Sequence, residues 1–475
     1  MNDYEMTIGI ECHVQLATKT KLFSAADNDA RDKEPNSVVS PVDYGLPGML
    51  PVLNREVVTM SIKAGKALNA EIARVSRFDR KHYFYPDLPK GYQTTQMYQP
   101  IILAGYVDAP LENGSIVRVR IHHAHLEEDA GKLTHYADYS LVDLNRAGTP
   151  LIEIVSEPDM HSAQEAKAYA SELYRLMTYA GVTHGNLYHG NMRFDVNISV
   201  AKKGATELGK RAEVKNLNSF RSVEKAAEYE FKRQVELLEK GELVVQETRG
   251  WDEAKQKTVS QRSKEEAQDY RYMPDADIPP IVLSDDEIKA VQAGVPKLPG
   301  EYREEFLRLG VDKSVITTVL GRQLLAEMVS QVLTRDQAAA KRVANWVASN
   351  LTIDEDLQLE SIARIDDLIE LARMTEAAEI SSNAASELFN DLMSGATDPR
   401  QLAEAKDLLQ VSDEGAIAAI VDEVLADPAS QKAVEDIKAG NDKAIGFLVG
   451  QIMKKSKGQA NPGLAQKLIK DRLNG

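Results

Sequence analysis

Cysteine is nearly absent from this sequence of 475 residues. Cys12 is its single cysteine, which excludes an internal disulfide framework and is typical of a reducing cytosol. The sequence also lacks any run of about 18 uncharged apolar residues, so no membrane-spanning segment is expected. Residues 1–6 are acidic and lack the basic start and apolar run of a signal peptide. Together these absences predict a cytoplasmic protein that does not associate with membranes.

Common nucleotide-binding and catalytic motifs are absent as well. The sequence has no GxxxxGK[ST] loop, no HExxH, no CxxC pair and no GxSxG. Use of ATP therefore cannot depend on a P-loop, and a Ser-rich amidase signature is also missing. Cys12 falls on the apolar side of an expected strand, where burial is a better interpretation than nucleophilic catalysis.

Positive charge is in short supply, because 57 Lys and Arg face 73 Asp and Glu and give a net charge of −16. Nonspecific nucleic-acid binding depends on neutralising phosphates with Lys and Arg, so this balance argues against it. Any RNA contact must use local basic patches. Residues 443–475 contain seven basic residues and one acidic residue, which fits either an RNA contact or a solvated helix face.

The pattern along the chain indicates about two to four domains, because 475 residues are too many for one compact core. Residues 6–16 alternate between apolar and polar, and helical stretches at 163–180 and 222–238 lie among further short alternating segments. Strands and helices mixed without a regular βαβ rhythm predict an α+β fold for about the first 290 residues.

Helical periodicity dominates after a Pro-rich segment at residues 277–281. Apolar residues follow i, i+3, i+4, i+7 spacing at 325–332 and at 365–372, which indicates helices joined by short loops. A second break at 394–399 leaves a final helical module of about 75 residues, an acceptable size for a small domain. We therefore predict three domains, at residues 1–293, 294–396 and 397–475.

Polar side chains occupy strand faces in several places. Glu11 and His13 lie two residues apart, so their side chains project to the same side, roughly 7 Å apart. Glu213 and Lys215 share a face in the same way, and residues 123–132 are dense in carboxylates and histidines. Another strand has a polar face made of Arg193, Asp195 and Asn197.

Such side chains suit a metal-assisted phosphoryl transfer. Carboxylates and imidazole on neighbouring strands are suitable ligands for Mg²⁺ or Mn²⁺, and interleaved Arg and Lys would balance phosphate oxygens. The alternative is that each strand presents a polar face to solvent. Spacing alone does not show that the strands converge, so both interpretations stay open.

Residues 78–92 interleave basic residues with five aromatic residues. This composition suits stacking on exposed bases and clamping phosphates, as proteins do with single-stranded RNA ends. A loop whose aromatic residues fill a local core is an equally good interpretation.

Several of these segments resemble the B-subunit family of the Asp/Glu-tRNA amidotransferases, and the likeness covers essentially the whole chain in order. The matching segments are residues 8–16, 78–93, 126–132, 140–159, 192–199, 213–220 and 446–462. The resemblance implies a cradle-shaped α+β domain with a mixed or antiparallel sheet, an all-α helical domain and a small α-helical tail domain similar to YqeY proteins.

The resemblance also implies an activity. The chain would use ATP to phosphorylate the side-chain carboxylate of mischarged Glu-tRNA(Gln) or Asp-tRNA(Asn), which ammonia then converts to the amide. An A subunit would release the ammonia from glutamine, and a small C subunit would complete a heterotrimer. Two alternatives remain, a noncatalytic tRNA-binding scaffold and a freestanding metal-dependent ligase for a small molecule.

The resemblance implies that six residues of this chain form the family's activation site. This catalytic set is Glu11, His13, Glu127, Glu128, Asp195 and Glu213. The implied cofactors are ATP and Mg²⁺, and all members of the set except Glu127 would hold the Mg²⁺. Candidates for phosphate or RNA contacts are Lys81, Tyr83, Tyr85, Lys90, Lys132, Arg193, Lys215, Lys454, Lys455 and Lys457.

The chain departs from the family at a zinc site that many relatives write as Cys-x-Cys followed by Cys-Pro-Val-Cys. The corresponding positions here are Ser24, Ala26, Ser40 and Asp43. Because no thiolate remains, we predict that no structural zinc is bound. We expect the loop at residues 23–41 to be held by packing or left mobile.

Overall fold

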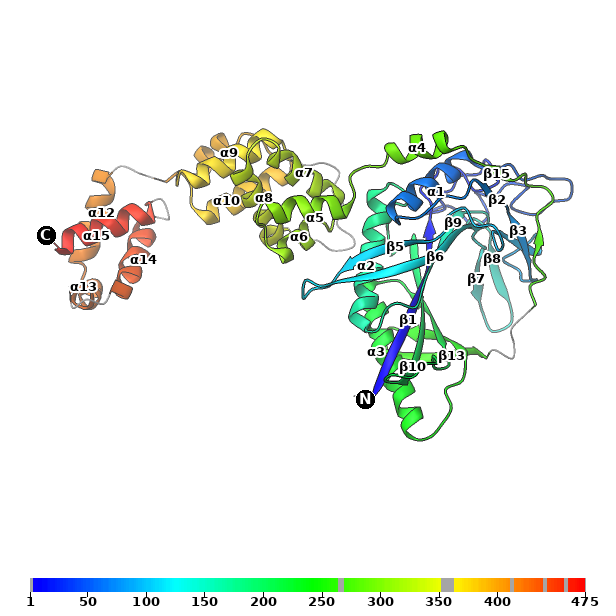
Figure 1. Ribbon diagram of the computed structural model, residues 1–475. Coiled ribbons are helices and arrows are strands. Elements are labelled where there is room, and N and C mark those ends of the chain that lie inside the picture. Colours follow the sequence, from blue (N-terminus) through cyan, green and yellow to red (C-terminus); the bar gives the residue numbers. More distant parts are fainter. Residues whose placement is uncertain are drawn as a thin grey trace. The chain divides into compact units, whose positions relative to one another are not determined.

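The computed structural model of the protein describes residues 3–263, 269–351, 363–410, 414–438, 442–456 and 460–474 (Figure 1). The chain divides into two compact units, Met1–Glu301 and Tyr302–Gly475. The first unit combines strands with helices, and the second is helical where it is described. This confirms the predicted α+β fold followed by helical domains, whereas the exact bounds of the three predicted domains stay predictions.

An eight-stranded sheet forms the centre of the first unit, in the order β13-β12-β11-β10-β1-β9-β6-β5. The neighbours β11 and β12 are parallel and the other neighbouring pairs are antiparallel. β1 lies between β10 and β9, so strands that are far apart in the sequence become neighbours. The strands are β1 (Tyr4–Gln15), β5 (Gly105–Pro110), β6 (Ile116–Glu128), β9 (Pro150–Ser156), β10 (Met192–Lys202), β11 (Ala212–Leu217), β12 (Glu247–Asp252) and β13 (Lys257–Ser263).

One face of this sheet is apolar and buried. The alternate residues of β1 from Ile8 to Val14 point into it, and Cys12 among them is fully buried, as predicted. Helices α2 (Ala163–Tyr179) and α3 (Phe220–Glu239) pack against strands of the sheet and against each other (Figure 1). Both helices coincide closely with the predicted helical stretches. Their burial of the apolar face leaves the opposite, polar face available for a site.

Smaller elements surround the sheet. A three-stranded sheet has the order β14-β3-β4, and β7 forms a hairpin with β8. Helices α1 and α4 pack together, and β2 pairs with β15. Their bounds are α1 (Arg55–Ala67), β2 (Val75–Ser76), β3 (Asp79–His82), β4 (Tyr92–Thr95), β7 (Lys132–His135), β8 (Ser140–Asp143), β14 (Met273–Pro274), β15 (Ile281–Val282) and α4 (Asp285–Ala293).

The second unit is built from amphipathic helices. The apolar residues predicted from spacing at 325–332 and 365–372 are buried on α7 and α9. Helices α12 to α15 enclose a core of their own, and no described helix is long and apolar enough to cross a membrane. The helices are α5 (Pro299–Arg308), α6 (Lys313–Val319), α7 (Gln323–Leu333), α8 (Gln337–Asn350), α9 (Ile365–Glu376), α10 (Ser382–Met393), α11 (Pro399–Ala405), α12 (Glu414–Ala426), α13 (Gln431–Lys438), α14 (Ile445–Lys455) and α15 (Pro462–Asn474).

Candidate active site

The polar face of the sheet gathers acidic residues from neighbouring strands. Glu11 of β1 lies opposite Asp195 of β10, and His13 lies opposite Glu153 of β9. Alternate residues of a strand project to the same face, so these side chains meet above the sheet. A cavity of about 740 Å³ opens there. It is lined by Glu11, His13, Lys81, Gln93, Glu127, Glu153, Arg211, Glu213, Lys215, Gln246, Glu247, Thr248, Gln261 and Tyr270.

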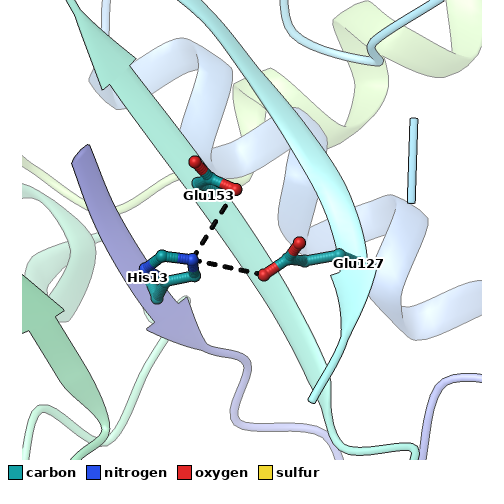
Figure 2. Close-up of side chains that lie close together, drawn as sticks. All are labelled: His13, Glu127 and Glu153. Carbon is teal, nitrogen blue, oxygen red and sulfur yellow. Dashed lines mark ion pairs between the residues drawn. The ribbon is translucent and has the colours of Figure 1, made fainter. Parts of the chain in front are cut away.

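The first acid cluster consists of His13, Glu127 and Glu153, from β1, β6 and β9. Figure 2 shows the three side chains turned toward one another, with Nε2 of His13 3.4 Å from Oε1 of Glu127 and 3.6 Å from Oε2 of Glu153. His125 approaches from β6, where its Nε2 lies 3.2 Å from Oε2 of Glu153. Each of the three cluster residues offers one ligand atom, and these atoms lie within 4.8 Å of one another.

The two carboxylates of the first cluster differ in their affinity for protons. Burial and the nearby charge of Glu153 raise the pKa of Glu127 above its ordinary value. Burial acts on Glu153 too, but the hydrogen bond and positive charge of His125 outweigh it and lower the pKa of Glu153. Two like charges held this close in a buried place favour a cation between them.

The second acid cluster consists of Glu11, Asp195 and Glu213, whose ligand atoms also lie within 4.8 Å of one another. Here a lysine supplies the counter-charge. Nζ of Lys215 lies 2.9 Å from Oδ2 of Asp195 and 3.0 Å from Oε1 of Glu213. Although burial opposes it, these two carboxylates raise the pKa of Lys215. Asn197 donates a hydrogen bond of 2.9 Å to Glu11.

The same cavity has a cationic and aromatic side. Lys81 lies over the ring of Tyr270, with Nζ 4.7 Å from the ring centroid, and both residues line the cavity. Tyr83 meets Tyr270 edge to face at 6.0 Å. Lys81, Arg211 and Lys215 are the cations among the lining residues and could contact phosphate oxygens.

Comparison with known proteins identifies the region that holds this site. Residues 6–289 match the family described as the GatB/GatE catalytic domain, and residues 327–473 match the GatB domain. The chain belongs to the GatB family. Proteins named as the B subunit of aspartyl/glutamyl-tRNA(Asn/Gln) amidotransferase are similar along the whole chain. One from Alkalilimnicola ehrlichii is 47% identical over 99% of this chain and 100% of the relative. One from Carboxydothermus hydrogenoformans is 43% identical over 100% of this chain and 99% of the relative.

Both acid clusters fall within the part of the chain that matches the GatB/GatE catalytic domain. The family resemblance noted in the sequence is thereby confirmed. Of the catalytic set implied by that resemblance, five residues meet on one face, namely Glu11, His13, Glu127, Asp195 and Glu213.

Glu128 is the member of the implied set that lies elsewhere. Consecutive strand residues face opposite sides, so Glu127 points to the clusters and Glu128 away from them. Glu128 is buried, forms an ion pair with Lys90 and accepts a 2.9 Å hydrogen bond from the backbone N–H of Thr94. Its catalytic role stays a prediction, and the geometry favours Glu127 and Glu153 as the metal ligands on this side.

The phosphate and RNA candidates are dispersed. Lys81 and Lys215 line the cavity, whereas Arg193 donates a 3.1 Å hydrogen bond to Asp129. Tyr83 is half-buried, and Tyr85 is exposed. Lys90 pairs with Glu128, and Lys132 lines a second cavity of about 320 Å³. Lys454 and Lys455 end α14, and Lys457 lies outside the described residues.

Sequence reasoning missed Glu153 and His125. Glu153 was not predicted as a site residue because its neighbours on β9 are apolar. Leu151, Ile152 and Ile154 of this strand are buried. A lone carboxylate within such a run is a usable signal, since burying a charge costs free energy unless something compensates it. His125 belonged to the segment rich in histidines and carboxylates, but its partner could not be chosen without the register.

The four positions at which the sequence predicts no zinc are connected by hydrogen bonds and an ion pair. Asp43 accepts hydrogen bonds from the hydroxyl of Ser24 at 3.0 Å and from the backbone N–H of Ser40 at 2.9 Å. The fully buried ammonium of Lys21 lies 3.5 Å from Asp43 and donates to the carbonyl of Ala147. A carboxylate and hydroxyls without thiolate or imidazole do not suit structural zinc. Hydrogen bonds hold these positions together instead.

Proposed function

We propose that this chain uses ATP to phosphorylate the side-chain carboxylate of mischarged Glu-tRNA(Gln) or Asp-tRNA(Asn), and that ammonia then converts the product to the amide. The observation that carries the proposal is the meeting of two acid clusters in one cavity of the matched catalytic domain. The relatives named as the B subunit of an amidotransferase support the same reaction. An aminoacyl-tRNA substrate also supports a cytoplasmic location.

The chemistry explains why ATP is needed. A carboxylate is a poor electrophile, because displacement by ammonia would expel oxide. Attack of the carboxylate oxygen on the terminal phosphorus of ATP forms an acyl phosphate and releases ADP. Ammonia then attacks the acyl carbon, phosphate leaves with the electron pair of the broken C–O bond, and a proton from the nitrogen passes to phosphate. The products are the amide, ADP and phosphate.

The residues present fit Mg²⁺. The first cluster offers two carboxylates and an imidazole, and the second offers three carboxylates, a donor set that hard divalent cations accept. Bound Mg²⁺ supplies charge neutralisation between the anionic carboxylate and the phosphoryl group. Lys81, Arg211 and Lys215 would bind phosphate oxygens at the rim of the clusters.

Ammonia and tRNA require other parts of the assembly. The sequence lacks a GxSxG motif and a Ser-rich amidase signature, so an A subunit would supply ammonia from glutamine, and a small C subunit would complete the heterotrimer. The basic residues at the end of α14 are our candidates for tRNA contacts. Lys455 forms an ion pair of 2.6 Å with Glu423, so Lys454 is the better candidate of the two.

The test is reconstitution with A and C partners, assayed by ATP- and Glu-tRNA-dependent phosphate release. Asp195→Asn should abolish this release and leave tRNA affinity unchanged, because Asp195 belongs to the second acid cluster. Unchanged release would favour the noncatalytic scaffold. Release that persists without tRNA would favour a small-molecule ligase.

A further inference from the structure

Three histidines of β6 lead from the surface to the first acid cluster. The pairing of β6 with β9 shifts register between Ile121 and His123, as a β-bulge does. A bulge re-aims the side chains beside it. The neighbouring residues His122 and His123 are thus brought into contact, with their Nδ1 atoms 2.7 Å apart.

The contacts continue inward. Nε2 of His123 lies 3.1 Å from Nδ1 of His125, and Nε2 of His125 lies 3.2 Å from Oε2 of Glu153. Exposure decreases along the same path, because His122 is exposed, His123 is intermediate and His125 is buried. The path therefore ends on a carboxylate of the first acid cluster.

The hydrogens on these rings are constrained by their neighbours. A carboxylate oxygen only accepts, so Nε2 of His125 must carry a hydrogen when it bonds to Glu153. The positively charged ring of His125 also carries a hydrogen on Nδ1, so Nδ1 of His125 donates to Nε2 of His123. A neutral His123 then donates from its Nδ1 to Nδ1 of His122. One consistent set of ring hydrogens therefore satisfies every contact in the path.

We propose that His125 and His123 are positioning residues that hold the Glu153 carboxylate in the orientation that binds a divalent cation at the first acid cluster. This inference rests on the proposed function, because it assigns a purpose to residues beside the ligands. A ligating carboxylate is usually fixed by a further hydrogen bond, and loss of that bond weakens metal binding. His125 supplies such a contact to Oε2 of Glu153, the oxygen that also faces His13. His123 does not contact Glu153 in this path; it acts indirectly, by fixing the orientation of the His125 ring.

Mn²⁺ titration of the full-length chain, followed by the electron paramagnetic resonance signal of free Mn²⁺, tests the proposal. His125→Ala should weaken Mn²⁺ binding about 10- to 100-fold, the usual effect of losing such a partner. His125→Gln should stay within about threefold of the wild type, since its amide nitrogen can replace Nε2 as a donor. His123→Ala should weaken binding about threefold to tenfold. His161→Ala, on an exposed histidine outside the path, is the matched control.

Activity of the reconstituted complex supplies a second measurement. The His123→Ala variant should need more Mg²⁺ for half-maximal phosphate release and recover its kcat at saturating Mg²⁺. A general loss of structure would lower kcat at every Mg²⁺ concentration. His123 is only partly buried, so this variant remains informative if His125→Ala does not fold.

The outcomes separate this inference from the proposed function. If Glu153→Gln loses Mn²⁺ binding while the His123 and His125 variants bind like the wild type, the positioning role is overturned and the metal site stands. If Glu153→Gln binds Mn²⁺ as tightly as the wild type, the metal assignment fails, and the positioning role fails with it.

Discussion

The two acid clusters share a cavity but are balanced in different ways. In the first, Glu127 and Glu153 face the imidazoles of His13 and His125. In the second, the permanent charge of Lys215 already lies between Asp195 and Glu213. An imidazole can itself act as a ligand, whereas an ammonium competes with an incoming cation. The first cluster should therefore bind the divalent ion more tightly, and the second should hold phosphate through its lysine.

The largest effect should come from removing one carboxylate from each cluster in turn. Glu153→Gln should weaken Mn²⁺ affinity more than about 100-fold, beyond the usual effect of residues behind a ligand. Glu213→Gln should change that affinity by less than about threefold, because Lys215 would still balance Asp195. Titration of the two variants side by side measures the difference. Equal losses would mean that the clusters act as one site.

The sequence predicted only part of the two acid clusters. The period-2 alternation of residues 6–16 predicted β1, its buried Cys12 and the shared face of Glu11 and His13. Convergence was beyond reach, because it depends on a strand order in which β1 lies between β10 and β9. The choice between two consecutive glutamates, Glu127 and Glu128, likewise requires the register.

A smaller effect is expected from the lysine of the second cluster. Lys215→Met should lower phosphate release about 10- to 100-fold, the range for losing a hydrogen bond to a charged group. It should also allow an additional Mn²⁺ to bind, since Asp195 and Glu213 would lose their counter-charge. Lys203→Met, an exposed lysine beyond the end of β10, is the charge-matched control. An unchanged number of bound Mn²⁺ ions would contradict the competition between lysine and metal.

A neutral neighbour of the second cluster should matter less. Thr248 donates a 2.9 Å hydrogen bond from its hydroxyl to Oε2 of Glu213. Thr248→Val keeps the shape of the side chain and removes the donor, so phosphate release should fall about twofold to tenfold, because Glu213 keeps its ion pair with Lys215. Thr248→Ser should retain the rate. A drop as large as that of Lys215→Met would show that Glu213 orientation outweighs its counter-charge.

The smallest effect should appear in stability without divalent ions. The pKa of Glu127 is raised in the folded protein, so folding favours its protonated form. The folded state then binds more protons than the unfolded state, and stability rises as pH falls through the raised pKa toward the ordinary value near 4.3. Glu127→Gln should remove this gain, worth at most about 1.4 kcal/mol per pH unit. Denaturant unfolding of both proteins from pH 7 to 5 measures the difference, and parallel curves would contradict the assignment.

The ion pair of Lys21 and Asp43 bears on whether this part of the chain depends on zinc. Three segments of the chain, around residues 21–24, 40–43 and 147, are joined there by a carboxylate and an ammonium instead of four thiolates. The prediction that no zinc binds here implies that zinc chelators and thiol oxidants would leave these contacts in place, because none of the three segments contains a cysteine.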